Sequence, residues 1–353
     1  MNAHSGRVAC SLRRGFLTMC FGGAALALGP AAGAADDQNW PIFKRRFIHN
    51  RERVVDTGND NVSHSEGQGW GMLFAESNDD KAAFLSLWEW TSASLQRGDK
   101  LFSWRWSSKT ADPVADKNNA ADGDILIAWA LARAARRWSE PKLAVQSQAI
   151  QDAILGHLLA EVQGRLILLP GLEGFARKDS RVVNLSYYVW PALADFARSA
   201  GEPARWRRLE TDGLWLLDKA SFGTYHLPPD WLLFGDREPK IADGWPPYFG
   251  FDAVRIPLYL AWRNEASRLG RFLAAWRTPK FGGRPPAWIN LKDGSVAPFA
   301  SPGGYDAVFA VAQFVANGLK NGAPTASIVD GDDYYSASLK LLANMAGQEA
   351  RLA

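Results

Sequence analysis

The sequence predicts an all-α fold built as one long domain. Apolar stretches of roughly 10 to 20 residues follow one another along most of the chain, as expected for successive buried helices. No alternation of strands and helices is visible, so a doubly wound sheet is not expected. No motif recurs at a fixed period, which argues against a solenoid. These observations favour a single helical barrel or a stack of helical hairpins.

The first 34 residues have the order of a cleavable export signal. Arg7, Arg13 and Arg14 precede the apolar run FLTMCFGGAALALG, and small residues follow up to Ala34. This order predicts cleavage near Ala34 and a periplasmic or secreted protein. The stretch SLRRGFL is similar to a twin-arginine signal, but paired arginines also precede apolar runs in ordinary secretory signals, so both export routes stay open.

The composition of residues 35–353 excludes several classes of partner. Without the three arginines of the signal, the 40 Lys and Arg become 37, equal to the 37 Asp and Glu. A neutral chain gives no reason to expect nucleic acid or an anionic membrane as a partner. No later stretch reaches the roughly 18 apolar residues of a membrane helix, so no stable membrane insertion is expected. Both cysteines, Cys10 and Cys20, lie in the signal, so no disulfide is expected.

The expected helices follow in chain order, separated by loops rich in Pro and Gly. The segment 125–138, ILIAWALARAARRW, is apolar on nearly every face before its arginines, as in a helix packed on all sides. A further helix is expected to begin near Ser65. The other helical segments are 80–95, 142–162, 186–200, 205–220, 252–264, 265–277, 305–319 and 334–346. The main loops are expected at 170–180, 234–250 and 279–286.

Tryptophan is unusually abundant, with 16 residues in the chain. Such abundance indicates either a large core or a groove with flat aromatic walls, on which sugar rings stack. In LFSWRWSS, Trp104 and Trp106 alternate as in an extended segment, which places both on one side. We expect at least one of them to bind a sugar ring, the alternative being that both belong to the core.

Carboxylates give the strongest chemical signal, because the chain has no metalloprotease, nucleophile-elbow or phosphate-loop motif. No cofactor or metal is expected. Glu66 in SEGQGWG, Asp122 and Asp124 in AADGD, and Asp252 in YFGFDAVRIP each lie near the start of an apolar helix. Each could instead cap its helix. Because helix starts gather at one end of a helical barrel, these acids predict an acidic floor in an aromatic groove.

These residues carry a family resemblance that covers most of residues 35–353. SEGQGWGMLFA, AADGDILIAWALARAARRW, NLSYYVWPAL, PPDWLLF and FDAVRIPLYLAW resemble segments of glycoside hydrolase family 8 endoglucanases, in particular the periplasmic enzymes that accompany bacterial cellulose synthase. The second segment resembles the family signature. It departs at Ala121, where the signature usually has Ser or Thr, which puts a local hydrogen bond in doubt.

The resemblance implies an (α/α)6 barrel over residues 35–353 and hydrolysis of β-1,4-glucan with inversion at the anomeric carbon. It implies that Glu66 is the general acid and Asp252 the general base. Asp122 matches an acid that contacts the sugar at the cleavage site. Tyr187 and Arg255 match polar residues near the attacking water and the base. The implied partners are a cellulose chain and the cellulose synthase machinery.

Two other functions are compatible with the same residues. Relatives of this family act on chitosan, xylan or mixed-linkage glucan, and an acidic groove would also suit a cationic chitosan chain. A non-catalytic, glucan-binding component of the cellulose export machinery is the second alternative. Neither product length nor oligomeric state follows from the sequence.

Overall fold

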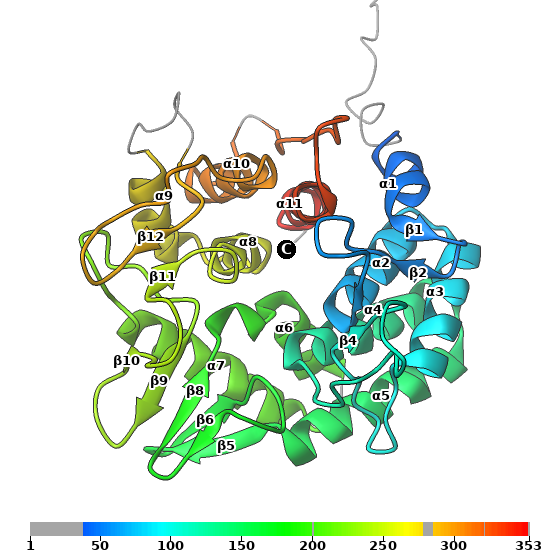
Figure 1. The fold of residues 1–353 in the computed structure, drawn as a ribbon, viewed down its shortest axis with the longest axis horizontal. Coiled ribbons are helices and arrows are strands. Elements are labelled where there is room, and N and C mark those ends of the chain that lie inside the picture. Colours follow the sequence, from blue (N-terminus) through cyan, green and yellow to red (C-terminus); the bar gives the residue numbers. More distant parts are fainter. Residues whose placement is uncertain (1–37, 200, 278–284, 321, 352–353) are drawn as a thin grey trace, which may run out of the picture. The chain divides into compact units, whose positions relative to one another are not determined.

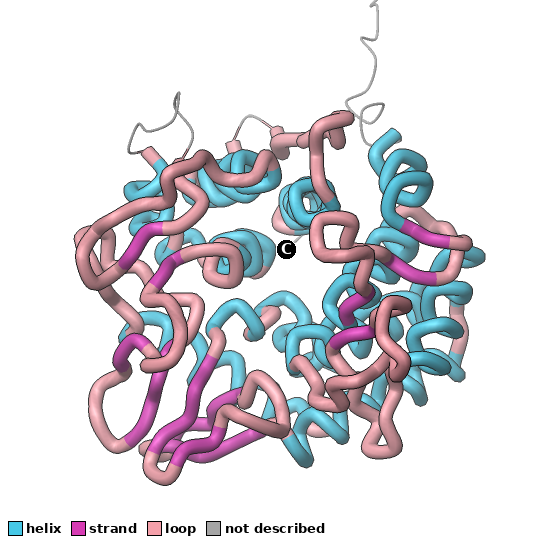
Figure 2. Tube along the Cα trace, viewed as in Figure 1, coloured by secondary structure: helices cyan, strands magenta, loops and turns pink. Residues whose placement is uncertain are grey.

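Helices are the main regular elements of the computed structural model, which describes residues 38–199, 201–277, 285–320 and 322–351 (Figure 2). The predicted export signal lies outside these residues. In the described part of the chain, no helix is both long and apolar enough to cross a membrane.

The helices of the described residues match most of the expected segments. Their bounds are α1 Asn39–Phe47, α2 Ser65–Ser77, α3 Lys81–Ser94, α4 Ala121–Trp138, α5 Pro141–His157, α6 Trp190–Ser199, α7 Pro203–Lys219, α8 Arg255–Trp262, α9 Gly270–Trp276, α10 Gly304–Ala316 and α11 Tyr334–Glu349. Two 3₁₀ turns cover Leu185–Tyr187 (η2) and Ala266–Arg268 (η3).

An inner layer of helices surrounds the axis of residues 35–353. Going round the ring, α2 lies beside α4, α4 beside α6, α6 beside α8, α8 beside α11, and α11 beside α2 (Figure 1). These helices are apolar on most faces: every residue of α8 is buried, and so are the first eleven residues of α4. A helix that is apolar on all sides needs neighbours on all sides, which a closed ring provides.

The outer helices cover this ring. Helices α3, α5 and α7 each pair with the inner helix that precedes them, and α10 packs against both α8 and α11 (Figure 1). The outer helices keep a polar face, as in α7, where Trp206, Leu209, Leu216 and Leu217 are buried while the arginines between them are exposed. The predicted (α/α)6 barrel is confirmed.

The strands are short and lie in the connections between helices. They are β1 Ile48–His49, β2 Arg53–Val54, β3 Ser63–His64, β4 Arg105–Trp106, β5 Leu159–Val162, β6 Arg165–Leu168, β7 Ala176–Arg177, β8 Ser180–Val183, β9 Leu232–Gly235, β10 Lys240–Ile241, β11 Tyr248–Phe249 and β12 Ile289–Asn290. The largest sheet has the order β10-β9-β8-β7 and is antiparallel.

The helix expected at 142–162 was too long. It ends at His157, and Leu159–Val162 instead pairs with Arg165–Leu168 in a hairpin. Gln163 and Gly164 form its turn with φ of 52° and 69°. Positive φ at both central residues is the geometry that matches the twist of a two-residue hairpin.

The inner helices begin at the same end of the barrel. Arg255, the first residue of α8, contacts residues at the starts of α2 and α4, and its Nη2 donates to Ser186 Oγ in η2, just before α6. Tyr335, the second residue of α11, donates through its hydroxyl to the carbonyl of Phe251. The helix starts therefore enclose one site.

Candidate active site

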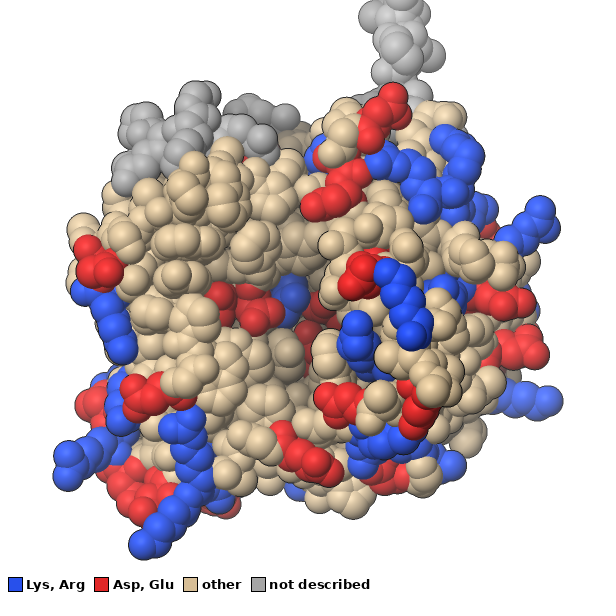
Figure 3. Space-filling model, viewed as in Figure 1, with Lys and Arg blue, Asp and Glu red and all other residues tan. Residues whose placement is uncertain are grey.

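Arg255 is the centre of a group of acids from three distant segments. Its Nη1 lies 2.7 Å from Glu66 Oε1, and its Nη2 lies 3.0 Å from Asp252 Oδ1 and 3.6 Å from Asp122 Oδ2. The arginine side chain is 5% exposed, whereas Asp252 keeps 29% of its side-chain surface accessible. Figure 3 shows acidic atoms on both sides of a basic one in a hollow at the centre of this face.

Glu66 is the second residue of α2 and is surrounded by groups that favour its neutral form. Burial raises its pKa well above the usual value, and the negative charges of Asp122 and Asp252 and a hydrogen bond with Asp122 act in the same direction, while Arg255 opposes them. Trp70, one turn further along α2, is fully buried and faces Arg255 at 6.0 Å. Glu66 is thus a carboxyl group that keeps its proton at higher pH than usual.

Asp122 is the second residue of α4 and is almost fully buried. Burial raises its pKa, while Arg255, the hydrogen bond with Glu66 and the Gly123 N–H favour its ionised form. The contact between Glu66 and Asp122 depends on Gly123, where a Cβ atom would lie 2.1 Å from Ser65 Oγ and 2.8 Å from the Glu66 nitrogen.

Capping does not explain Glu66, Asp124 or Asp252, because the N-cap residues of α2, α4 and α8 are others and none of them makes a side-chain cap. Asp122 does accept the Gly123 N–H in the first turn of α4. The N-cap of α4 is Ala120, which has no side-chain oxygen, and Ala121, where the signature has a hydroxyl, is the first residue of the helix. Asp124 instead accepts hydrogen bonds from the Phe102 N–H at 2.8 Å and the Asn119 amide at 2.6 Å. It therefore holds the segment that leads to Trp104 and is not part of the group around Arg255.

Asp252 lies in the turn just before α8, so its carboxylate is outside the helix. Arg255, three residues on, forms an ion pair with it. Tyr187 also faces this group, with its ring 5.9 Å from the Arg255 guanidinium. Burial, together with the surrounding carboxylates, raises the pKa of Tyr187, so its hydroxyl remains protonated.

Trp104 and Trp106 differ in their surroundings. The segment that carries both residues lies beside the start of α2, because the Ser65 N–H donates to the Trp104 carbonyl and β3 pairs with β4. Trp106 packs against the core, with the Arg53 guanidinium 4.4 Å from its ring and Trp90 against its edge. The Trp104 indole N–H donates to Asp116 at 2.7 Å, and its ring is half-buried.

Sequence reasoning missed Asp230 and the aromatic pair Trp231 and Trp245. Asp230 Oδ1 accepts hydrogen bonds from the N–H groups of Gly250 and Ala253, on either side of Asp252. Trp231 meets Tyr187 edge-on at 6.1 Å and stacks on Trp245 at 5.3 Å. The available signals were PPDWLLF, one of the segments with the family resemblance, and DGWPPYFG in the loop predicted at 234–250, both of which combine Pro, Asp and Trp.

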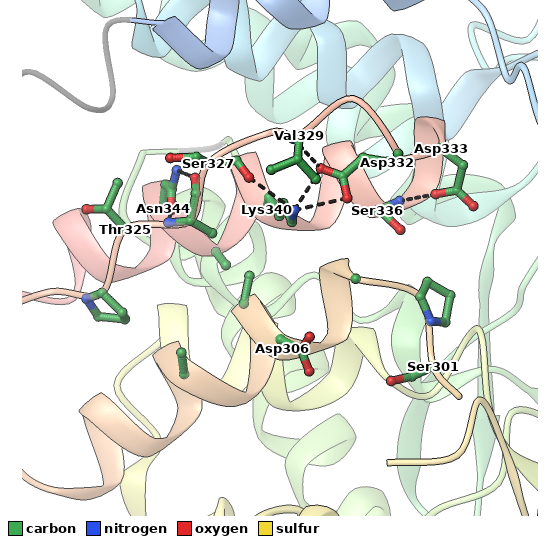
Figure 4. Close-up of a pocket in the computed structure, with 18 residues that line it drawn as sticks. Ser301, Asp306, Thr325, Ser327, Val329, Asp332, Asp333, Ser336, Lys340 and Asn344 are labelled. Atoms are coloured by element: carbon green, nitrogen blue, oxygen red, sulfur yellow. Dashed lines mark hydrogen bonds and ion pairs between the residues drawn. The ribbon is translucent and has the colours of Figure 1, made fainter. Parts of the chain in front are cut away.

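A separate hollow of about 800 Å³ lies between α10, α11 and the loop before α11 (Figure 4). Lys340 Nζ lies 2.7 Å from Asp332, and Asp333 accepts the Ser336 N–H. None of the predicted site residues lines it. Across the described ranges, no three or more His, Cys, Asp or Glu side chains are grouped as metal ligands.

Comparison with known proteins gives consistent matches. The family model of the glycosyl hydrolases family 8 matches residues 16–349. A probable endoglucanase of Novacetimonas hansenii is 42% identical over 329 residues, which cover 92% of this chain and 94% of the relative. The crystal structure of endoglucanase Cel10 from Klebsiella pneumoniae has a TM-score of 0.82 and 42% identity, covering 89% of this chain and 99% of that one. The endo-β-1,4-glucanase CMCax from Acetobacter xylinum has a TM-score of 0.82 and 40% identity, covering 91% and 100%.

Proposed function

The chain belongs to the glycosyl hydrolases family 8, and from this premise we propose that it is an inverting endo-β-1,4-glucanase with Glu66 as general acid and Asp252 as general base. The observation that carries the proposal is the arrangement around Arg255, which holds a proton-retaining Glu66 beside a partly exposed Asp252. The endoglucanase names of the relatives support the glucan substrate.

The proposed reaction needs one proton donor and one proton acceptor. A glucosidic oxygen is a poor leaving group, so Glu66 gives it a proton as the bond to the anomeric carbon breaks. Asp252 removes a proton from a water molecule, whose oxygen attacks that carbon from the opposite face of the ring. Asp252 can meet this water because more than a quarter of its side chain is accessible.

The surrounding residues fit supporting roles. Asp122 lies beside Glu66 and raises the pKa of the acid, and we propose that it also binds the sugar at the cleavage site. Tyr187 and Arg255 position the water and Asp252. The half-buried ring of Trp104 offers a face for a further glucose unit of a long chain.

The anomeric configuration of the first product tests the proposal. Proton NMR of a fresh cellopentaose digest should show the α anomer first, because no covalent intermediate forms. Glu66→Gln and Asp252→Asn should each abolish turnover, while Glu66→Gln still binds the glucan. An initial β signal would show that the mechanism is not inverting. Either Asp252 would then be a nucleophile, or another acid would act in its place.

The alternatives are separated by a panel of substrates. Release of reducing sugars from carboxymethylcellulose, lichenan, xylan and chitosan should be fastest with a β-1,4-glucan. Faster hydrolysis of chitosan or xylan would show that the same barrel acts on one of these alternative substrates instead of on β-1,4-glucan. Binding of glucan without any turnover would support the non-catalytic alternative.

We also propose that the enzyme is exported and acts with cellulose synthase machinery. The predicted signal at residues 1–34 supports export, and the first residue of the purified mature protein should be Ala35. Replacing Arg13 and Arg14 by Lys should block export only if the twin-arginine route is used. A gene position beside cellulose synthase genes would support the biosynthetic role.

A further inference from the structure

Asp230 lies beneath the turn that carries Asp252. It follows Pro228 and Pro229 and precedes β9. Its Oδ1 accepts hydrogen bonds from the Gly250 N–H at 3.1 Å and the Ala253 N–H at 2.7 Å. Its own N–H donates to the Tyr248 carbonyl at 2.7 Å. One carboxylate therefore ties together the residues on both sides of Asp252.

The contact between Asp230 and the turn is close. A Cβ atom on Gly250 would lie 2.9 Å from Asp230 Oδ2 and 3.3 Å from Trp288 Cβ. Any larger residue would force the turn and the carboxylate apart. Glycine at position 250 thus permits the approach on which both hydrogen bonds depend.

The remaining contacts of the turn come from other elements. The Tyr335 hydroxyl, from α11, donates to the Phe251 carbonyl, and Arg255 binds the Asp252 carboxylate. The Val254 N–H donates to the Gly250 carbonyl at 3.0 Å. Asp230 is the group that holds the two N–H donors flanking Asp252, so neither Tyr335 nor Arg255 replaces it.

Asp230 belongs electrostatically to the same group of acids. Asp252, Arg255, Tyr305 and Tyr335 face it. Burial raises the pKa of Asp230 to about 7, and the negative charge of Asp252 adds to this effect, while the two N–H donors oppose it. Burying an acid beside other acids costs free energy. Such a cost is typical of residues that serve a functional site.

We propose that Asp230 is a positioning residue for Asp252, fixing the turn so that the Asp252 carboxylate points at the attacking water. The inference rests on the proposed function, because it takes Asp252 to be the general base. A displacement of about 1 Å at a catalytic group can lower the rate on the order of 100-fold. The role of Asp230 is therefore expected to appear in kcat.

The test compares Asp230→Ala with Asp230→Asn on cellopentaose. Removing the acceptor should lower kcat by about 10- to 100-fold with little change in KM, because the ground-state sugar contacts remain. The amide in Asp230→Asn keeps an oxygen for the two N–H groups and should restore most of kcat. Gly250→Ala pushes on the same carboxylate and should reproduce the loss even if Asp230→Ala is unstable.

Asp212→Ala is the matched control. Asp212 is also a buried acid that accepts a backbone N–H, from Leu166 at 2.8 Å, but it lies outside the group around Arg255. This variant should lower Tm without lowering kcat.

Two results would overturn the inference. In the first, Asp230→Ala loses only stability, as the control does. In the second, Asp230→Asn is as inactive as Asp230→Ala, which would make the carboxyl group itself part of the chemistry. Turnover in Asp252→Asn would instead remove the proposed function, so the two failures are distinguishable.

Discussion

At the scale of residues, the site depends on the balance of charge around Arg255. A buried guanidinium at the first position of a helix is opposed by the helix dipole, whereas acids near helix starts are favoured by it. Glu66, Asp122 and Asp252 supply three negative charges against this single cation. Full ionisation would leave the group with excess negative charge. One proton is therefore retained, on Glu66, whose pKa is raised well above its usual value by burial and by the neighbouring acids.

This balance gives a pH prediction for Asp122→Asn. The negative charge of Asp122 and its hydrogen bond raise the pKa of Glu66, so the amide should lower that pKa. Glu66 would then lose its proton at lower pH, and the alkaline limb of kcat/KM should shift toward lower pH. A profile of rate against pH measures the shift even if kcat also falls.

The exposed Asp218, which pairs with Arg268, supplies the control. Asp218→Asn should leave the pH profile unchanged. An unchanged alkaline limb in Asp122→Asn would show that Glu66 is not the group that titrates there.

At the scale of elements, α2 and α4 are brought together by glycines. A Cβ atom on Gly123 would meet Ser65 and Glu66, and one on Gly69 would lie 2.6 Å from Leu126 Cβ. Gly123→Ala should therefore separate the starts of α2 and α4. We expect a loss of about 1 to 3 kcal/mol in stability and a loss of activity larger than this change in stability explains.

Gly156 in α5 is the matched control, because a Cβ atom there would meet nothing within 4 Å. Gly156→Ala should raise stability by about 0.5 kcal/mol, because alanine loses less backbone freedom than glycine when the chain folds. Activity should be unchanged. Thermal unfolding and cellopentaose turnover measure both effects. Full activity in Gly123→Ala would show that the close approach of the two helices is not needed.

The segment that contains β4 gives a second prediction at this scale. Trp106 is fixed between Arg53 and Trp90, while Trp104 has its indole N–H on Asp116. Trp104→Ala should weaken cello-oligosaccharide binding by about 1 kcal/mol with little change in Tm. Trp106→Ala should instead lower Tm, because it removes packing under the strand. Calorimetric titration and melting curves would contradict this division if the two effects were exchanged.

At the scale of the whole molecule, the helices were largely predictable and their connections were not. The apolar runs at 125–138 and 334–346 indicated α4 and α11 directly, but the closed barrel of inner and outer helices followed from family resemblance and not from the pattern of residues. The sheet of β7 to β10 was missed because strands of two to four residues show no useful alternation. Asp230 was missed because the residues it binds lie 20 and 23 positions away.

Closure of the ring joins the two ends of the described chain. The Asn39 side chain, at the start of α1, donates to the Ala326 carbonyl and accepts the Ile328 N–H. The side-chain amide of Asn344, in α11, accepts a hydrogen bond from the Ala326 N–H and donates one to the Ala326 carbonyl. These contacts place α1 against the last helix, as Figure 1 shows.

The last helix is also fixed at its far end. Glu349, the final residue of α11, accepts two hydrogen bonds from Arg133 of α4, at 2.7 and 3.0 Å, and one from the Trp262 indole of α8 at 2.8 Å. A helix of 16 residues spans about 24 Å. This network therefore lies far from Tyr335 and the acids at the other end of α11.

Glu349→Gln should consequently reduce stability without impairing catalysis. The glutamine amide has only one acceptor oxygen, so it cannot accept both hydrogen bonds from Arg133. The positive charge of the largely buried Arg133 is then less well neutralised. We expect a loss of about 2 kcal/mol, below that of a fully buried pair because Glu349 is 32% exposed. Glu161→Gln breaks an ion pair with Arg208 in which Glu161 is 60% exposed, and should change stability by less than about 0.5 kcal/mol. Denaturant unfolding of both variants, with kcat measured on the folded protein, would contradict this account if the two losses were equal or if Glu349→Gln reduced kcat.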